Sequence, residues 1–274
     1  MSGQGADPPP TPADPGQWGD LSTRLISGIL IAATSLAALW LGGIWFLMLV
    51  AIATGLMVWE VWTMVAPERQ THGVLMAVLT VAVVFGVATL DTGPGLLLFL
   101  VIPAAGLALP SDRGWLFGLF GAGIVFAGWG LVVIRAELGL VWSLWLVLVV
   151  AMSDIAGYFA GRMIGGPKFW PAISPKKTWS GTIAGWIGAA ALGLIFVIAT
   201  DAGASLILLS VIVCFAGQMG DIAQSALKRR MGVKDSSDLI PGHGGVYDRF
   251  DALMGATLVM LVLTVLMRLV GGPF

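Results

Sequence analysis

The chain has 274 residues, of which 58% are hydrophobic and only 11% are charged. Because soluble globular domains contain about 25% charged residues, this composition excludes an ordinary soluble protein. It predicts an all-α, polytopic integral membrane protein. The formal net charge of −1 is uninformative by itself, since the placement of charge matters more than its sum in a membrane protein. No nucleic-acid partner is expected.

Residues 1–22 are rich in Pro, Gly and Asp and contain no Lys or Arg, which predicts a disordered cytoplasmic tail. Nine apolar runs follow, and most are long enough to cross a hydrocarbon core of about 30 Å. The fourth run is short and contains Pro103, so it is the weakest of the set. The nine predicted spans are 24–41, 44–65, 73–90, 95–110, 114–134, 138–160, 181–200, 203–227 and 252–270.

The cationic residues predict how these spans are oriented. With nine spans, only Arg135 and Arg268 of the fourteen Lys and Arg residues fall on one side of the membrane. Since positively charged loops stay in the cytoplasm, the N-terminus and the charged loops are expected there and the C-terminus outside. We therefore expect a protein of the cell (inner) membrane. The chain also divides in character, into an apolar scaffold at 23–150 and a catalytic region at 151–274 with cytoplasmic loops at 161–180 and 228–251.

The stretch 225–251 holds five of the fourteen Lys and Arg residues, four acids and one of the two histidines. Such dense charge beside hydrocarbon is costly unless something is bound there. Carboxylates suit a hard divalent cation, Lys and Arg suit phosphate oxygens, and glycines allow a backbone to approach a ligand. The composition predicts a site where a metal ion and phosphates meet at the membrane surface.

The eighth span continues into this stretch and carries polar residues on one face. If it stays helical to Arg230, then Asp221, Ser225 and Lys228 lie at i, i+4 and i+7. Further on, Asp248 and Asp251 stand one helical turn apart at the start of the last span. We expect Asp248 to be a metal ligand with Asp221, and Asp251 to be a helix cap or a supporting residue.

Three other features contribute to the predicted site. In His243-Gly244-Gly245 an imidazole precedes two glycines, as a backbone cradle for phosphate requires, although a simple glycine turn would look the same. The segment 174–178 presents two adjacent lysines and forms either one wall of an anion pocket or an ordinary basic patch. Asp154 and Glu60 are acids inside predicted spans; a functional or interhelical role is expected for Asp154, while Glu60 has no obvious partner.

These residues resemble the signature of the phosphatidate cytidylyltransferase (CDP-diacylglycerol synthase) family. The segments Ser174 to Thr178 and Asp154 to Arg162 are similar to family patterns as well, whereas Ser180 stands where many members carry Glu. The signature positions, which match in type and spacing, are Ser225, Lys228, Arg229, Lys234, Asp235, Ser237, Pro241, His243, Gly244, Gly245, Asp248, Arg249 and Asp251.

The resemblance implies a nucleotidyltransferase that converts CTP and phosphatidic acid into CDP-diacylglycerol and pyrophosphate in phospholipid biosynthesis. It also implies Mg²⁺ at Asp221 and Asp248 and a homodimeric assembly. It is compatible with an additional monovalent cation such as K⁺. Catalysis is expected from these two aspartates with Lys177 and Lys228. Substrate contacts are expected from Ser174, Lys176, Lys177, Thr178, Ser225, Lys228, Arg229, Lys234, Asp235, His243, Gly244, Gly245 and Arg249.

Three alternatives remain open at the level of sequence. A CTP-dependent lipid kinase would use similar cation and phosphate contacts but would transfer the γ-phosphoryl group. A proton-coupled transporter would use Asp154 and Asp221 as a relay, and would show two related halves that this sequence lacks. A scaffold that merely gathers anionic lipid would not place Asp221 and Asp248 beside its cations.

Overall fold

The computed structural model describes residues 16–90, 93–108 and 112–269, and these residues form a helical membrane protein, as predicted. Seven segments are long and apolar enough to cross a membrane, and one of them, Gly114–Met163, contains two helices, α5 and α6. The helices are α1 (Gly16–Leu41), α2 (Gly43–Val65), α3 (Gln70–Leu90), α4 (Val101–Leu107), α5 (Gly114–Val133), α6 (Gly139–Met163), α7 (Trp179–Ala199), α8 (Ser205–Met231) and α9 (Tyr247–Leu269).

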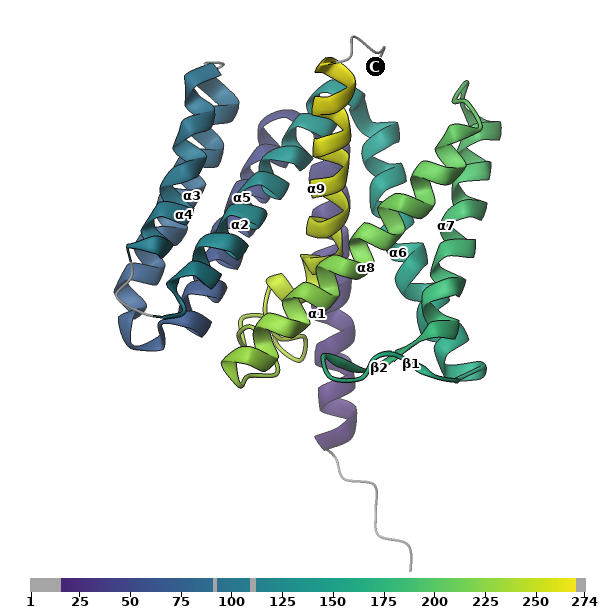
Figure 1. Cartoon of the computed structure of the whole chain (residues 1–274), viewed down its shortest axis with the longest axis horizontal. Helices are drawn as coiled ribbons and strands as arrows, with labels where there is room; N and C mark the ends of the chain where they lie inside the picture. The colour runs from purple at the N-terminus through teal and green to yellow at the C-terminus, as the bar shows by residue number, and fades with distance from the viewer. Residues whose placement is uncertain (1–15, 91–92, 109–111, 270–274) are drawn as a thin grey trace, which may run out of the picture.

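The predicted count of nine spans is not confirmed, because α5 and α6 lie in one continuous segment and the fourth predicted span is too short to count by length and composition. It consists of a 3-10 helix, Gly93–Leu100, followed by the seven residues of α4. A 3-10 helix rises about 2.0 Å per residue against 1.5 Å in an α-helix, so this segment extends roughly 26 Å. In Figure 1 it runs back alongside α3. The extended helical form explains how a short stretch can return the chain across the bundle.

The two ends of the bundle differ in what they carry. The start of α1, the β-hairpin after α6 and the loop between α8 and α9 lie at one end, and the end of α9 lies at the other (Figure 1). Residues 1–15 of the expected tail lie outside the described residues, and α1 begins at Gly16, within that predicted tail. Both charged loops therefore belong to the same end as the start of α1.

The charged loop before α7 contains a β-hairpin that the all-α expectation did not include. Strand β1 (Lys168–Trp170) pairs antiparallel with β2 (Ser174–Thr178). Thr178 ends β2 and is also the N-cap of α7, since its hydroxyl accepts the amide of Gly181 at 3.2 Å. The hairpin thus leads directly into α7 and fixes the direction in which its lysines leave the strand.

Glycines let the helices of the charged end pack closely. A Cβ on Gly220 of α8 would lie 2.5 Å from the carbonyl oxygen of Asp251 in α9, and one on Gly255 would lie 2.5 Å from the carbonyl oxygen of Ala216. Such close approach through small residues is common between membrane helices. Because α8 and α9 touch along their backbones, the polar residues that they carry are brought together.

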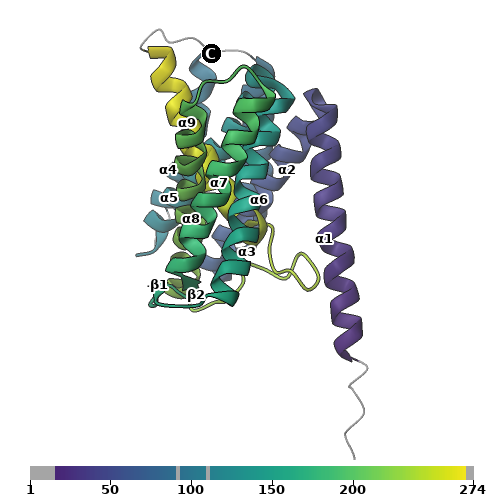
Figure 2. The same ribbon diagram turned by 90° about the vertical axis from the view of Figure 1, so that its right-hand side faces the viewer.

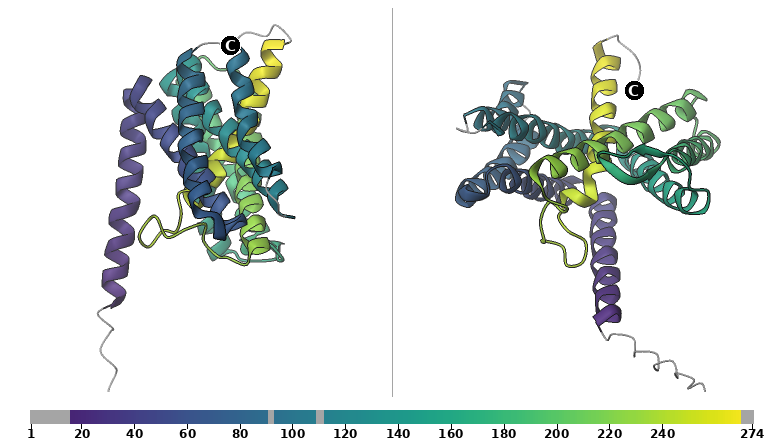
Figure 3. Two further views of the ribbon diagram at one scale, coloured as in Figure 1. Left: turned by 90° about the vertical axis from the view of Figure 1, so that its left-hand side faces the viewer. Right: turned by 60° about the horizontal axis from the view of Figure 1, so that its bottom comes forward.

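Helix α1 stands along one side of the bundle, and the loop between α8 and α9 reaches toward it (Figures 2 and 3). The contact is polar: the Ser27 hydroxyl lies 2.7 Å from Nδ1 of His243 and donates to the carbonyl oxygen of Pro241 at 3.1 Å. Most of the apolar residues of α1 are exposed, including Leu25, Ile29 and Leu36. Exposed apolar side chains are expected on a helix whose outer face meets lipid.

Candidate functional site

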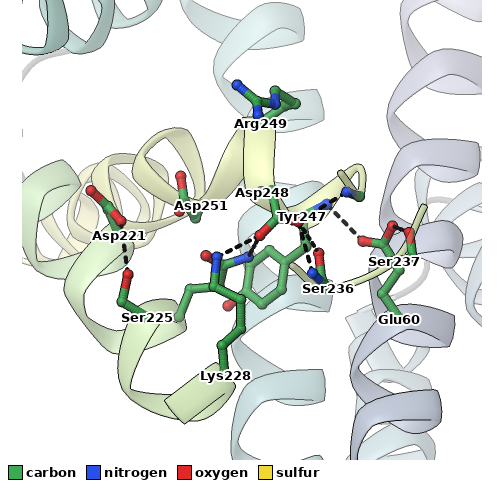
Figure 4. Close-up of polar contacts among 12 residues, drawn as sticks. Glu60, Asp221, Ser225, Lys228, Ser236, Ser237, Tyr247, Asp248, Arg249 and Asp251 are labelled. Atoms are coloured by element: carbon green, nitrogen blue, oxygen red, sulfur yellow. Dashed lines mark hydrogen bonds and ion pairs between the residues drawn. The ribbon is translucent and has the colours of Figure 1, made fainter. Parts of the chain in front are cut away.

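Asp248, near the start of α9, is surrounded by protein donors (Figure 4). Its Oδ1 accepts from Nε2 of Gln224 at 2.9 Å and from Nζ of Lys228 at 2.5 Å. Its Oδ2 accepts from the amide and the hydroxyl of Ser236, at 2.8 and 2.7 Å, and from the amide of Gly245 at 2.9 Å. We call these five residues the Asp248 cluster; it joins α8, the following loop and α9.

Glu60, which had no assigned partner, supports the same loop from α2. The carboxylate is fully buried, and Oε1 accepts from the Ser237 hydroxyl at 2.6 Å. The amides of Val246 and Tyr247 donate to Oε1 and Oε2 respectively, each at 2.7 Å. A buried carboxylate held by three donors is a structural anchor. Glu60 therefore links the N-terminal scaffold to the loop that precedes α9.

The two glycines after His243 approach carboxylates of the protein. A Cβ on Gly244, whose φ is +78°, would lie 2.9 Å from Oδ2 of Asp248. One on Gly245 would lie 2.4 Å from Oε1 of Glu60. Since the amide of Gly245 donates to Asp248, that amide does not serve the expected phosphate cradle in this structure. Because these two glycines lack a Cβ, the loop can pass close to the carboxylates of Glu60 and Asp248.

Asp221 lies on α8 in a more open environment. Helix α8 continues to Met231, as the prediction for this face required, and the Ser225 hydroxyl donates to Oδ1 of Asp221 at 3.3 Å. Oδ2 forms an ion pair with Nζ of Lys177 from β2. The side chain of Asp221 is 30% exposed, against 6% for Asp248. Lys228, expected on the same face, pairs with Asp248 instead.

A hollow of about 390 Å³ opens beside this ion pair, between α6, α7 and the hairpin. Its walls combine cations with hydroxyl and carboxyl groups, and Gln218 of α8 closes it by donating to the hydroxyl of Ser153 at 3.2 Å. We call it the Lys177 hollow. Its charged and hydroxyl-bearing lining residues include Asp154, Tyr158, Arg162, Lys176, Lys177 and Thr178.

Asp154 lines this hollow, and Asp221 is paired with Lys177, which also lines it. The charges of Asp154 on α6 and Asp251 on α9 both interact with that of Asp221. Asp251 is the fifth residue of α9, so it lies beyond the position of an N-cap, and its Oδ1 accepts from the amide of Ala252 at 2.7 Å. The expected cap role is wrong for Asp251. Asp248, the second residue of α9, accepts the amide of Gly245 ahead of the helix, and Glu60 accepts the amides of Val246 and Tyr247 at its start.

The remaining predicted residues occupy other places. Thr178 caps α7, while the Ser180 hydroxyl donates to the carbonyl oxygen of Gly165 at 2.5 Å. The guanidinium of Arg249 donates to the carbonyl oxygen of His243 from Nε at 3.0 Å and Nη2 at 2.6 Å, on the side facing α1. Other predicted residues lie at the surface: Ser174 in β2 is partly exposed, and Arg229, Lys234 and Asp235 are exposed.

The expected pairing of Asp221 and Asp248 around one metal ion can be compared with these contacts. Both oxygens of Asp248 already accept protein donors, whereas Asp221 has one cation and one hydroxyl as partners. Among the described residues, no group of three or more His, Cys, Asp or Glu side chains is placed to hold a metal. Mg²⁺ is usually held by one or two carboxylates together with substrate phosphates. Asp221 fits that arrangement, and Asp248 does not fit it as it is bonded here.

Sequence reasoning missed the two glutamines of α8 and Ser236. Gln218 bridges α8 to Ser153 and Trp186, and Gln224 is fully buried against Asp248. The available signal was a row of polar residues at intervals of three or four along an apolar helix, running from Gln218 through Asp221 to Ser225. In membrane helices such residues usually face other helices, because lipid offers no hydrogen bonds.

Comparisons with known sequences identify the family of this chain. The sequence pattern of the cytidylyltransferase family matches residues 22–267. A phosphatidate cytidylyltransferase of Brucella suis is 38% identical over 251 residues, which cover 88% of this chain and 92% of that protein. One of Brucella abortus is 37% identical over the same shares. A phosphatidate cytidylyltransferase of Staphylococcus saprophyticus is 42% identical over 123 residues, or 44% of this chain and 47% of that protein.

Proposed function

We propose that this chain, a nucleotidyltransferase that belongs to the cytidylyltransferase family, transfers CMP from CTP to phosphatidic acid. The observation that carries the proposal is the Lys177 hollow, which places a lysine–aspartate pair and further cations at one end of a membrane bundle. Relatives named for this reaction that align with most of the chain support the choice of substrates. The products would be CDP-diacylglycerol and pyrophosphate.

The proposed reaction forms one bond and breaks one. A phosphate oxygen of phosphatidic acid attacks the α-phosphorus of CTP, and the bond from that phosphorus to the oxygen bridging the α- and β-phosphates breaks. Pyrophosphate carries away the electron pair. The lipid phosphate is already anionic, so no strong base is needed, and the barrier comes chiefly from bringing two anions together. Positioned cations are the groups that lower such a barrier.

The residues of this chain supply those cations from two elements. Lys176 and Lys177 leave strand β2 and Arg162 leaves the end of α6, and all three line the Lys177 hollow. They would neutralise the triphosphate and hold it in place. Lys228 is already paired with Asp248, so we assign it to holding the loop and the start of α9 rather than to binding substrate.

We further propose that Asp221 binds Mg²⁺ together with phosphate oxygens of the nucleotide. When bound, Mg²⁺ would screen the charge of the triphosphate and of the departing pyrophosphate. The 30% exposure of Asp221 and its place beside the Lys177 hollow support this assignment. The ion pair between Lys177 and Asp221 would then rearrange, since Lys177 and the metal ion would share the carboxylate of Asp221. A cytoplasmic orientation of this end and a homodimeric assembly stay predictions.

Radiolabelled CTP tests the proposed function. Purified protein in liposomes is given phosphatidic acid, Mg²⁺ and CTP labelled at either the α- or the γ-phosphorus. We expect the α-label to enter the lipid fraction and the γ-label to leave as pyrophosphate. Transfer of the γ-label into lipid, with the α-label left in CDP, would instead identify a CTP-dependent lipid kinase and refute the proposal.

A further inference from the structure

A second and larger hollow, of about 810 Å³, lies between α1, α2, α6 and α9. Its walls are mostly apolar and include Leu36 of α1, Met57 of α2 and Leu146 of α6. We call it the α1 groove. It is more than twice the size of the Lys177 hollow. No residue of the Asp248 cluster lines it, although neighbouring residues of the same loop and helix do.

One end of the α1 groove is polar and cationic. His243 and Arg249 line it there, and the Ser27 hydroxyl contacts Nδ1 of His243 at 2.7 Å. The Arg249 side chain points away from Asp248 in Figure 4 and is exposed, while Nε and Nη2 donate to the carbonyl oxygen of His243. An apolar channel that ends at a guanidinium complements a molecule with hydrocarbon chains and one anionic head.

The α1 groove also has a suitable position relative to the Lys177 hollow. Ala151 of α6 lines the groove, and Ser153 and Asp154, within the next turn of the same helix, line the hollow. Ala151 and Asp154 are three positions apart and therefore lie on the same face of α6. A ligand in the groove and a nucleotide in the hollow would approach one another along this face, near the charged end of the bundle.

We propose that the α1 groove binds the acyl chains of phosphatidic acid, with its phosphate at Arg249 and His243. This inference rests on the proposed function and adds the place and the chemistry of lipid binding. The cationic end commits the site to an anionic lipid, since apolar walls alone would accept any bilayer lipid. Helix α1 then forms one wall of the substrate site, and the Ser27 contact holds that wall against the loop.

Two adjacent alanines of α1 provide a matched test. Ala32 lines the α1 groove, whereas Ala33, which is also exposed, does not. In Ala32→Trp the indole fills part of the groove, so we expect kcat/KM for dioleoyl phosphatidic acid to fall about tenfold. The same variant should use dihexanoyl phosphatidic acid, and bind CTP, about as well as the unmodified protein. Ala33→Trp should match the unmodified protein with both lipids.

Equal effects of the two tryptophans, or an equal loss with long and short chains, would overturn the proposal. Crosslinking of the unmodified protein gives a second measurement that needs neither turnover nor a variant. Phosphatidic acid with a photoreactive acyl chain should label peptides of α1, α2 and α6 that line the groove, and unlabelled phosphatidic acid should suppress this labelling. Suppression by phosphatidylcholine to the same extent would mean ordinary bilayer lipid, and labelling elsewhere would also refute the groove.

The two measurements separate the proposals. If the unmodified protein transfers no α-label to lipid but the groove is labelled selectively by phosphatidic acid, the proposed reaction is wrong and the lipid site stands. If CMP is transferred but the groove is not labelled, the reaction stands and the lipid site is wrong.

Discussion

Asp248 and Asp221 are the two aspartates that the sequence places together, and the structure gives them opposite surroundings. Asp248 is 6% exposed and accepts hydrogen bonds from one helix, α8, and from the loop that follows it. Asp221 is 30% exposed and meets one lysine and one hydroxyl beside a hollow. Dense charge at the end of a membrane bundle thus serves two purposes. One carboxylate holds the loop in shape, and the other remains accessible to a ligand.

Removing the carboxylate of Asp248 should have the largest effect. In Asp248→Ala the ammonium of Lys228 and the donors from Ser236 and Gly245 lose their acceptor. Breaking a buried ion pair by removing one partner costs about 3–5 kcal/mol, so both stability and turnover should fall. Thermal unfolding in detergent measures the loss. An unfolding midpoint equal to that of the unmodified protein would show that the Asp248 cluster is not an anchor.

Asp221→Asn should separate activity from stability. The amide keeps the shape of the side chain and can still accept from Ser225, but it removes the charge that faces Lys177 and the hollow. We expect turnover to fall on the order of 100-fold. The unfolding midpoint should hardly change, because the ion pair is about one-third exposed and such pairs stabilise little. If Asp221→Asn unfolded as readily as Asp248→Ala, the proposed difference between the two aspartates would be contradicted.

Glu60→Gln tests the support that the scaffold gives to the loop. A glutamine presents one acceptor and one donor where Ser237, Val246 and Tyr247 all donate, so one donor loses its partner. The expected cost is about 1–3 kcal/mol of stability. Ser237→Ala removes one of the three donors and leaves both backbone amides satisfied, so it serves as the milder control. The unfolding midpoint of Glu60→Gln should therefore be lower than that of Ser237→Ala, and the reverse order would contradict the role of Glu60.

The smallest effect is expected at the lysines of β2. Lys177 forms the ion pair with Asp221, whereas its neighbour Lys176 is exposed at the edge of the same hollow. In Lys177→Met the KM for CTP should rise about tenfold through the loss of charged contacts. Lys176→Met should raise it less. Steady-state kinetics at fixed lipid concentration distinguishes them, and a larger effect at Lys176 would move the nucleotide away from Asp221.

The sequence predicted what periodicity and charge determine. Long apolar runs predicted the helices, and the spacing of Asp221 and Ser225 predicted a shared face, because an α-helix repeats every 3.6 residues. The fourth span was harder, since its 3-10 geometry changes the length that a given number of residues can cover. The hairpin of β1 and β2 was missed because a strand of Ser, Pro, Lys and Thr lacks the alternating apolar pattern of a buried strand.

The partners of the individual acids could not be predicted, because they come from distant parts of the chain. Glu60 meets residues 237, 246 and 247, and no local pattern in the sequence records those contacts. The glycines at 244 and 245 were expected to let a phosphate approach the backbone, whereas the groups that approach them in the structure are Asp248 and Glu60. A residue type constrains the chemistry of a contact, and only the fold selects the partner.

Binding of Mn²⁺ in the presence of CTP, followed by electron paramagnetic resonance, tests the division between the two aspartates most directly. Mn²⁺ takes the oxygen ligands that Mg²⁺ takes. If Asp221 is the accessible carboxylate, the unmodified protein should bind Mn²⁺ with CTP, and Asp221→Asn should lose most of that binding while it remains folded. Undiminished Mn²⁺ binding by Asp221→Asn would contradict the account.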